Sequence, residues 1–132
     1  MYLGTSLTDF DGNRHEMVGV LPVESSMEKS RLTLGYREVQ ALVDGPLLSQ
    51  GQRIRGHEFH WSVSSIEHDS SAASAEEVSS TAAYEVVNQD GRLEGIRQGN
   101  VWASYIHLHL ASAPGTAQRW VETCASVMQS QV

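Results

Sequence analysis

Apolar and polar residues alternate over several short stretches of this chain, and this is the pattern of strands. Residues 32–43 and 52–66 alternate and predict two long strands that pair through a turn near Gly45, with a bulge at Gly35. Two shorter runs, residues 83–87 and 93–96, flank Asp90-Gly91 and predict a hairpin. Near the N-terminus, we expect residues 1–7 to form the remnant of a helix and residues 17–21 a short strand.

The run V-W-A-S-Y-I-H-L-H-L, residues 101–110, is mainly apolar on both sides of a strand. Such a strand is usually interior to a sheet covered by helices. Tyr105, His107 and His109 fall on one face, near the carboxyl end, where open α/β sheets tend to place ligands. Two interpretations remain open, because the histidines could serve chemistry or could be hydrogen-bonded core residues.

The last predicted element is a helix with Ser112 as its N-cap and Pro114 in its first turn. Six apolar residues recur on one face of this helix and are expected to pack in the core: Ala117, Trp120, Val121, Cys124, Val127 and Met128. A catalytic thiol needs a helix N-terminus or a cationic neighbour. Cys124 lies late in an apolar face, so we interpret it as a small core residue and not as a nucleophile.

Composition and charge are those of one modest cytoplasmic domain spanning residues 1–132. The formal net charge of −7 argues against general nucleic-acid binding, and no apolar run approaches a membrane span. A single cysteine excludes an internal disulfide. Residues 67–80 are serine, alanine and acid, which predicts a flexible surface loop, with a functional lid as the alternative.

Four motifs, in order and with ordinary spacing, carry a resemblance to one family. They are M-Y-L-G-x-S-L-x-D (residues 1–9), G-Y-R-E (35–38), G-H-E-F-H (56–60) and Y-x-H (105–107). The chain resembles the C-terminal part of cobyrinic acid a,c-diamide synthase, also met as hydrogenobyrinic acid a,c-diamide synthase. The resemblance implies an α/β fold: a partial class I glutamine amidotransferase-like, flavodoxin-like domain with a mixed sheet and a C-terminal helix.

In that family a cysteine attacks the side-chain amide of glutamine, a histidine moves the protons, and the released ammonia amidates two acetate side chains of a corrinoid ring. The resemblance assigns the histidine role to His107. It also implies that the chain begins just after the nucleophilic cysteine. The ATP-binding domain, which would bring ATP and Mg²⁺, is expected to be absent as well, because no phosphate-loop motif occurs. We therefore expect no cofactor in this chain itself.

The group that orients the histidine is less clear from the sequence. Many class I amidotransferases carry a glutamate two residues after it, but that position here is His109. Either the machinery is a cysteine and histidine pair without an acid, or Glu58 orients the base; we favour the pair. His57, His60 and Tyr105 would line the wall of the site, or the first two would belong to a polar network between strands. A four-histidine zinc site is disfavoured, because His57 and His60 point to opposite faces of a strand.

Three functional hypotheses follow. The chain is the distal part of a split amidotransferase that is inactive alone and needs a complementary synthase chain. Alternatively, it is a non-catalytic binding or assembly module, which would bind a tetrapyrrole or a synthase subunit, or it is the remnant of a truncated synthase gene. In each case an incomplete sheet would expose apolar surface, so we expect self-association, such as a homodimer.

Overall fold

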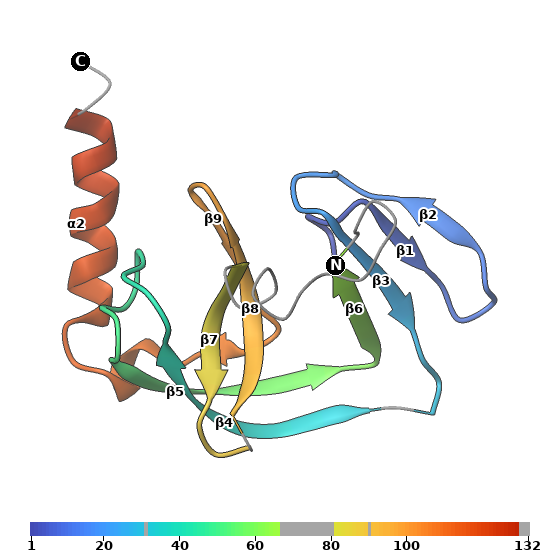
Figure 1. Ribbon diagram of the computed structural model, residues 1–132, viewed down its shortest axis with the longest axis horizontal. Helices are drawn as coiled ribbons and strands as arrows, with labels where there is room; N and C mark the ends of the chain where they lie inside the picture. Colours follow the sequence, from blue (N-terminus) through green and yellow to red (C-terminus); the bar gives the residue numbers. More distant parts are fainter. Residues whose placement is uncertain (31, 67–80, 90, 130–132) are drawn as a thin grey trace. The chain divides into compact units, whose positions relative to one another are not determined.

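The computed structural model describes residues 1–30, 32–66, 81–89 and 91–129 (Figure 1). Two compact units emerge, one made of Met1–Leu34 with Phe59–Ser80 and the other of Gly35–Glu58 with Thr81–Val132. The expected loop at residues 67–80 lies outside the described residues, and so does Asp90. The assignment of residues 1–132 to one domain stays a prediction.

The first unit contains a four-stranded mixed sheet. Its order is β2 (Arg14–Glu16), β1 (Ser6–Thr8), β3 (Val23–Met27) and β6 (Ser62–Ile66). Strands β1 and β3 run parallel, while β1 with β2 and β3 with β6 are antiparallel. Leu21 is the one apolar side chain among this unit's described residues that is buried, beside the buried serines Ser6, Ser25 and Ser62. The apolar core of this unit is therefore thin.

The second unit is built on a six-stranded sheet. Its order is β10 (His107–Leu108), β5 (Arg53–His60), β4 (Thr33–Ala41), β7 (Ala82–Val86), β8 (Arg92–Gln98) and β9 (Val101–Ala103). The strands β9 and β10 follow each other in the chain but occupy opposite edges of this sheet. The sheet must therefore bring its two edges together.

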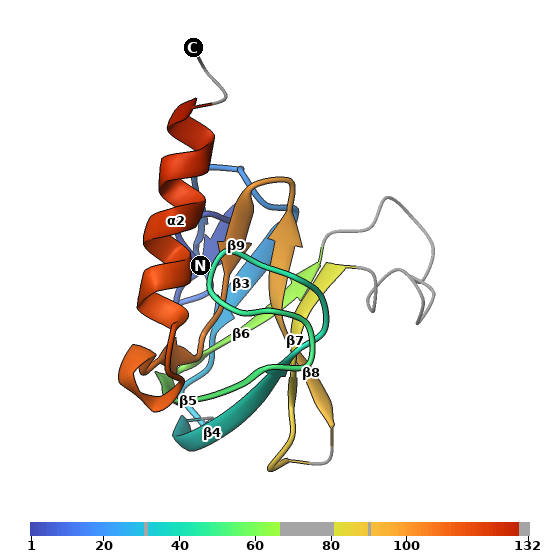
Figure 2. The same ribbon diagram turned by 90° about the vertical axis from the view of Figure 1, so that its left-hand side faces the viewer.

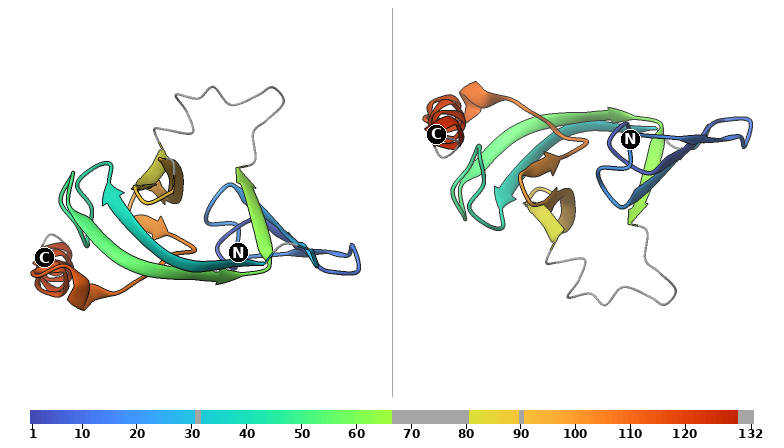
Figure 3. Two further views of the ribbon diagram at one scale, coloured as in Figure 1. Left: turned by 90° about the horizontal axis from the view of Figure 1, so that it is seen from below. Right: turned by 90° about the horizontal axis from the view of Figure 1, so that it is seen from above.

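The length of the connection shows how strongly this sheet curls. Only residues 104–106 separate the two edge strands, and four extended steps reach about 14 Å. Six strands lying flat would put the edges about 24 Å apart at a spacing of about 4.8 Å. The sheet consequently curls so that its two edges approach each other, and the pronounced bend of β4 and β5 is visible in Figure 3.

The concave side of this sheet holds the main hydrophobic core. Its buried members are Val39, Ala41, Leu48, Ile54, Ala83, Tyr84, Val86, Ile106 and Ala113, with Trp102 and Leu108 packed against them. The sequence accounts for this directly, since buried and exposed side chains alternate along β5. Alternation thus accounts for the contribution of β5, whereas in β7 the neighbouring residues Ala83 and Tyr84 both belong to the core.

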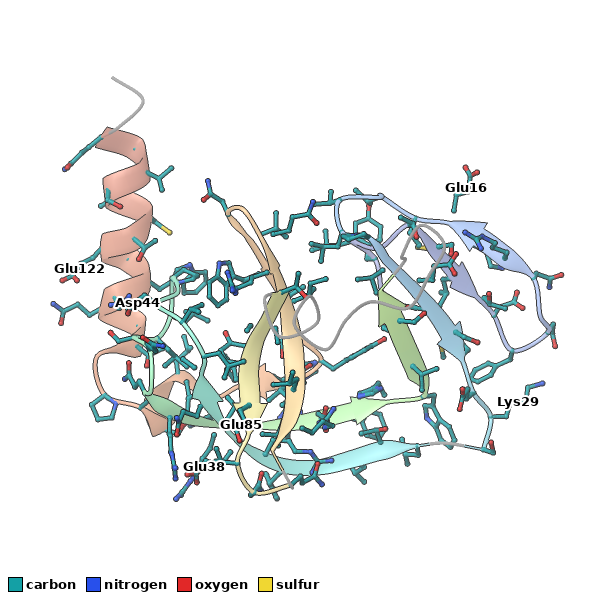
Figure 4. All side chains as sticks on the ribbon, viewed as in Figure 1. Glu16, Lys29, Glu38, Asp44, Glu85 and Glu122 are labelled. Atoms are coloured by element: carbon teal, nitrogen blue, oxygen red, sulfur yellow. The ribbon has the colours of Figure 1, made fainter. Side chains whose placement is uncertain are left out.

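The C-terminal helix α2 (Thr116–Gln129) lies beside the loop between β4 and β5 (Figure 2). Arg119 donates to the carbonyl oxygen of Gly45 at 2.8 Å and to Ser49 Oγ at 3.0 Å. Asp44, labelled in Figure 4, adds a carboxylate 3.7 Å from Arg119. Polar contacts therefore attach this helix.

The expected packing of the apolar helix face is wrong. Trp120, Val121, Val127 and Met128 are exposed, and Cys124 is an exposed free cysteine and not a core residue. Ser112 is not the N-cap either, because it ends a short 3-10 helix, η1 (Leu110–Ser112), and the α-helix starts after Gly115. An amphipathic pattern identifies which face is apolar, but it does not reveal whether this chain covers that face.

Some of the remaining predictions of strands and turns are confirmed, and others are wrong. The strands at residues 32–43 and 83–87 and the hairpin after them are confirmed, and Gly35 has a φ of +148°. Residues 1–7 form no helix but lead into β1, and the strand expected at residues 17–21 lies instead at β3, after Pro22. The expected strand at residues 52–66 is interrupted at Trp61. The fold class itself, mixed α/β with a C-terminal helix, is confirmed.

Candidate functional site

The stretch at residues 101–110 is two short strands and not one interior strand. Strand β10 pairs antiparallel with the edge of β5, with His107 opposite His57 and Leu108 opposite Gly56. The amide of His109 then donates to the carbonyl of Arg55 at 2.8 Å. His107 and His109 are exposed, so the interpretation as buried core histidines is wrong, and so is a helix-covered interior strand.

His57 and His107 form a close pair on the exposed face of the sheet. The distance from His107 Nδ1 to His57 Nε2 is 3.2 Å, and the two rings meet edge to face at 85° with centroids 4.8 Å apart. Residues directly opposite each other in an antiparallel pair share a face. The strand pairing therefore brings together two histidines that are 50 positions apart.

Gly56 permits the close approach of β10 to β5. A Cβ atom at this position would lie 2.4 Å from the carbonyl oxygen of His107 and 2.8 Å from Ile106 Cγ2. A backbone oxygen held in a strand cannot move away cheaply, so a side chain here would displace the strand that carries His107. The close packing of β10 on β5 thus explains why a glycine precedes the H-E-F-H residues.

Glu58 lies on the opposite, buried face of β5 and is fully buried. Its Oε2 accepts from Arg37 Nε at 2.6 Å and its Oε1 from Arg92 Nη2 at 2.8 Å. Burial alone would raise the pKa of Glu58, but the hydrogen bonds and charges of the two arginines lower it below its usual value. The side chain points away from the face of His107, so this geometry does not favour Glu58 as the group that orients the base.

Glu94 holds the residues that lead into β10, and no motif or periodic pattern in the sequence indicates this role. This largely buried carboxylate accepts from Ser104 Oγ at 2.7 Å and from the amide of Tyr105 at 3.0 Å. The amide of Ile106 in turn donates to Ser104 Oγ at 2.9 Å. Burial raises the pKa of Glu94 despite these hydrogen bonds. Glu94 of β8 thus fixes the turn after β9. No local sequence pattern predicts this contact.

The positions of the other candidate residues do not assign them a role. Tyr105 is half-buried in this turn and shares no strand with His107. His60 Nδ1 lies 2.8 Å from the carbonyl oxygen of Ser62, at the start of β6. His109 continues the β10 pairing opposite Arg55. Their roles stay predictions. Among the described residues, no cluster of three or more histidine, cysteine or acidic side chains is arranged to hold a metal ion.

Comparison with known proteins identifies the family of this chain. The family described as the CobB/CobQ-like glutamine amidotransferase domain matches residues 1–115. The chain belongs to this family. Within the part of the chain that the structure describes, no helix is long and apolar enough to cross a bilayer.

Curated relatives narrow the comparison further. The chain is 40% identical over 124 residues to the cobyrinate a,c-diamide synthase of Syntrophotalea carbinolica, covering 94% of this chain and 26% of the relative. It is 43% identical over 108 residues to the hydrogenobyrinate a,c-diamide synthase of Streptomyces coelicolor, covering 82% and 20%. The Salmonella typhimurium cobyrinate a,c-diamide synthase is 34% identical over 133 residues, covering 97% and 27%. The chain spans about a quarter of the length of these relatives.

Proposed function

We propose that this chain supplies the catalytic base, His107, to a cytoplasmic glutamine amidotransferase whose nucleophilic cysteine and ATP site lie outside these 132 residues. One observation carries the proposal: a chain of this family presents the His107 imidazole, paired with a second histidine, on an exposed sheet edge. A base in this position is accessible to a thiol from another polypeptide segment. The ammonia would then amidate carboxylates of a corrinoid, as the names of the relatives suggest.

In this reaction the role of the chain is proton transfer by His107. A neutral imidazole takes the proton of the thiol, the thiolate attacks the amide carbon of glutamine, and the imidazolium returns the proton to the leaving ammonia. Cys124 is a poor alternative nucleophile, since it lies in the middle of α2 and away from the helix N-terminus. ATP and Mg²⁺ would act on the acceptor carboxylate in another domain.

The decisive experiment is complementation. The unmatched part of the Syntrophotalea carbinolica relative is purified and mixed with this chain, and glutamate release from glutamine is measured. We expect neither part to be active alone and the mixture to hydrolyse glutamine. His107→Ala should reduce the rate of the mixture by about 10²-fold or more, the usual contribution of a general base.

The matched control is Glu122→Gln, which changes an exposed side chain of α2 (Figure 4) and should leave the rate unchanged. Hydrolysis by this chain alone, abolished by Cys124→Ala, would show instead that the nucleophile is internal. A mixture that forms a complex but stays inactive would contradict the catalytic proposal and favour the alternative of a binding or assembly module.

Exposed apolar surface supports an association with another polypeptide. Among the described residues of the first unit, nine large apolar side chains are exposed: Met1, Tyr2, Phe10, Val18, Val20, Leu32, Leu34, Phe59 and Trp61. The apolar face of α2 is exposed as well. Soluble monomers rarely leave such surface open to water. We propose that a complementary synthase chain covers it, and that the isolated chain self-associates as a homodimer or larger assembly.

Self-association can be measured directly. Light scattering at tens of micromolar should give a mass above the 14.5 kDa of one chain. If the face of α2 takes part, Val121→Glu should lower the mass toward the monomer, because it places a charge on the apolar surface. Ser126→Glu, on another face of the same helix, should have no effect. A strictly monomeric unaltered chain would contradict the proposal.

A further inference from the structure

We propose that His57 is the positioning residue of the site: its Nε2 accepts a hydrogen bond from Nδ1–H of His107 and so presents Nε2 of His107 as the base. No carboxylate is then needed for orientation. This assignment rests on the proposed function, since it states how the base of that reaction is held. It goes beyond the two sequence-based expectations for His57, which are a place in the wall of the site or in a polar network between strands.

The strand pairing fixes the position of His57. His107 and His57 are directly opposite each other in the β10 and β5 pair, so their side chains project from the same face. The 3.2 Å separation of the two nitrogens is within hydrogen-bond range, and the nearly perpendicular rings direct the edge of one imidazole toward the other. The backbone alone would keep this pair together.

The other two candidates for the orienting role are placed elsewhere. Glu58 is the next residue along β5, so it projects to the opposite face, where it binds Arg37 and Arg92. His109 lies two positions after His107, just past the end of β10, which puts its Cα about 7 Å from that of His107, and its amide donates to Arg55. Of these three residues, His57 is the one whose side chain lies at hydrogen-bond distance from Nδ1 of His107.

The direction of the hydrogen bond decides whether His107 can be a base. If Nδ1 carries the proton and donates it to His57, the lone pair of Nε2 is free to accept a proton from a thiol. If His57 donates instead, Nε2 of His107 carries the proton and cannot act as base. An acceptor at Nδ1 is how orienting groups fix the tautomer of catalytic and metal-binding histidines. A neutral imidazole can do this without adding a negative charge.

The test uses long-range ¹⁵N NMR of the histidine rings in the full chain, which reports the tautomer of each imidazole without requiring activity. We expect His107 to be predominantly protonated at Nδ1. His57→Ala should move the tautomer ratio toward that of free imidazole, and His57→Gln, which retains an acceptor oxygen, should restore most of the Nδ1–H form. His109→Ala should leave the ratio of His107 unchanged.

A predominantly Nε2-protonated His107, or a tautomer ratio that does not respond to His57→Ala, would overturn the assignment. Amide spectra of each variant establish that the fold is kept. If the strand edge rearranges in His57→Ala, His57→Gln alone is decisive, since an Nε2-protonated His107 in that variant also contradicts the proposal.

The complemented glutaminase assay separates this proposal from the proposed function. His57→Ala should lower kcat by about 10- to 100-fold, as loss of an orienting partner does for metal-binding histidines, with KM for glutamine nearly unchanged and with recovery in His57→Gln. An active mixture that tolerates His57→Ala refutes the positioning role only. An inactive mixture whose His107 still has the expected tautomer refutes the function only.

Discussion

Replacing Glu58 with alanine is expected to destabilise the chain more than any other single change to a charged residue described above. The carboxylate is fully buried and bridges Arg37, itself nearly buried, to Arg92. Removing one partner of a buried ion pair leaves uncompensated charge and costs about 3–5 kcal/mol. Small domains have a free energy of unfolding of about 5–15 kcal/mol, so the loss should be visible as a large decrease of the urea midpoint.

Glu38 provides the matched control for this substitution. It lies on β4 and pairs with Arg53 and Arg55, whose side chains are largely exposed (Figure 4). Exposed ion pairs contribute about 1 kcal/mol or less. Glu38→Ala should therefore change the urea midpoint little. Equal effects of the two substitutions would contradict the structural role of Glu58.

The pH dependence gives an independent check on Glu58. Because its folded-state pKa lies below the ordinary value of 4.5, its contribution to stability is fully present above that value. The contribution is lost as the pH falls through the folded-state pKa. The difference in unfolding free energy between the unaltered chain and Glu58→Gln should therefore be constant near neutral pH and shrink below about pH 4.5. A difference that grows on acidification would reverse the sign and contradict the assignment.

Replacing Gly56 with valine is expected to separate the two histidines. The added side chain would overlap the backbone oxygen of His107, so β10 must move away from β5 at a cost of about 1–3 kcal/mol, as for overpacked sites. His107 would then lose its register with His57. We expect the Nδ1–H tautomer of His107 and the complemented glutaminase activity to be lost together, while the strands β4, β5 and β7 stay protected in hydrogen exchange.

Gly99→Ala is the appropriate comparison for Gly56→Val. Gly99 has a φ of +57°, and nothing lies within 4 Å of a Cβ atom there. Alanine at such a position costs about 1 kcal/mol of backbone strain, without a clash near the histidines. Retained histidine pairing in Gly99→Ala and lost pairing in Gly56→Val would tie the effect to the strand contact. Retained pairing in both would disprove the role of Gly56.

How far the sequence predicts this structure depends on the range of the contacts concerned. The strand at β4 and the hairpin of β7 and β8 follow from alternation and a turn, which are local signals. The break between β9 and β10 does not, because it depends on Glu94, which is ten residues from Ser104 in the sequence. Taken alone, the continuous apolar run of residues 101–110 therefore predicts one strand.

The candidate site shows the same limit. The motif resemblance identified His57, Glu58 and His107, but which of the first two meets His107 depends on the pairing register, and a shift of one residue would exchange their faces. No pattern within either segment fixes that register. Gly56 is a local feature consistent with the observed pairing, since a glycine permits the close approach of the β10 backbone.

The curled sheet has a consequence for the timing of local motions. Its two edges are its shortest strands, β9 with three residues and β10 with two. Short edge strands contribute few backbone hydrogen bonds, and segments with few such bonds open first in native-state fluctuations. We therefore expect amide protons of β10 to exchange faster than those of β4. His107 would then alternate between held and released states on its own timescale, and a partner that binds across this edge would hold the histidine in place.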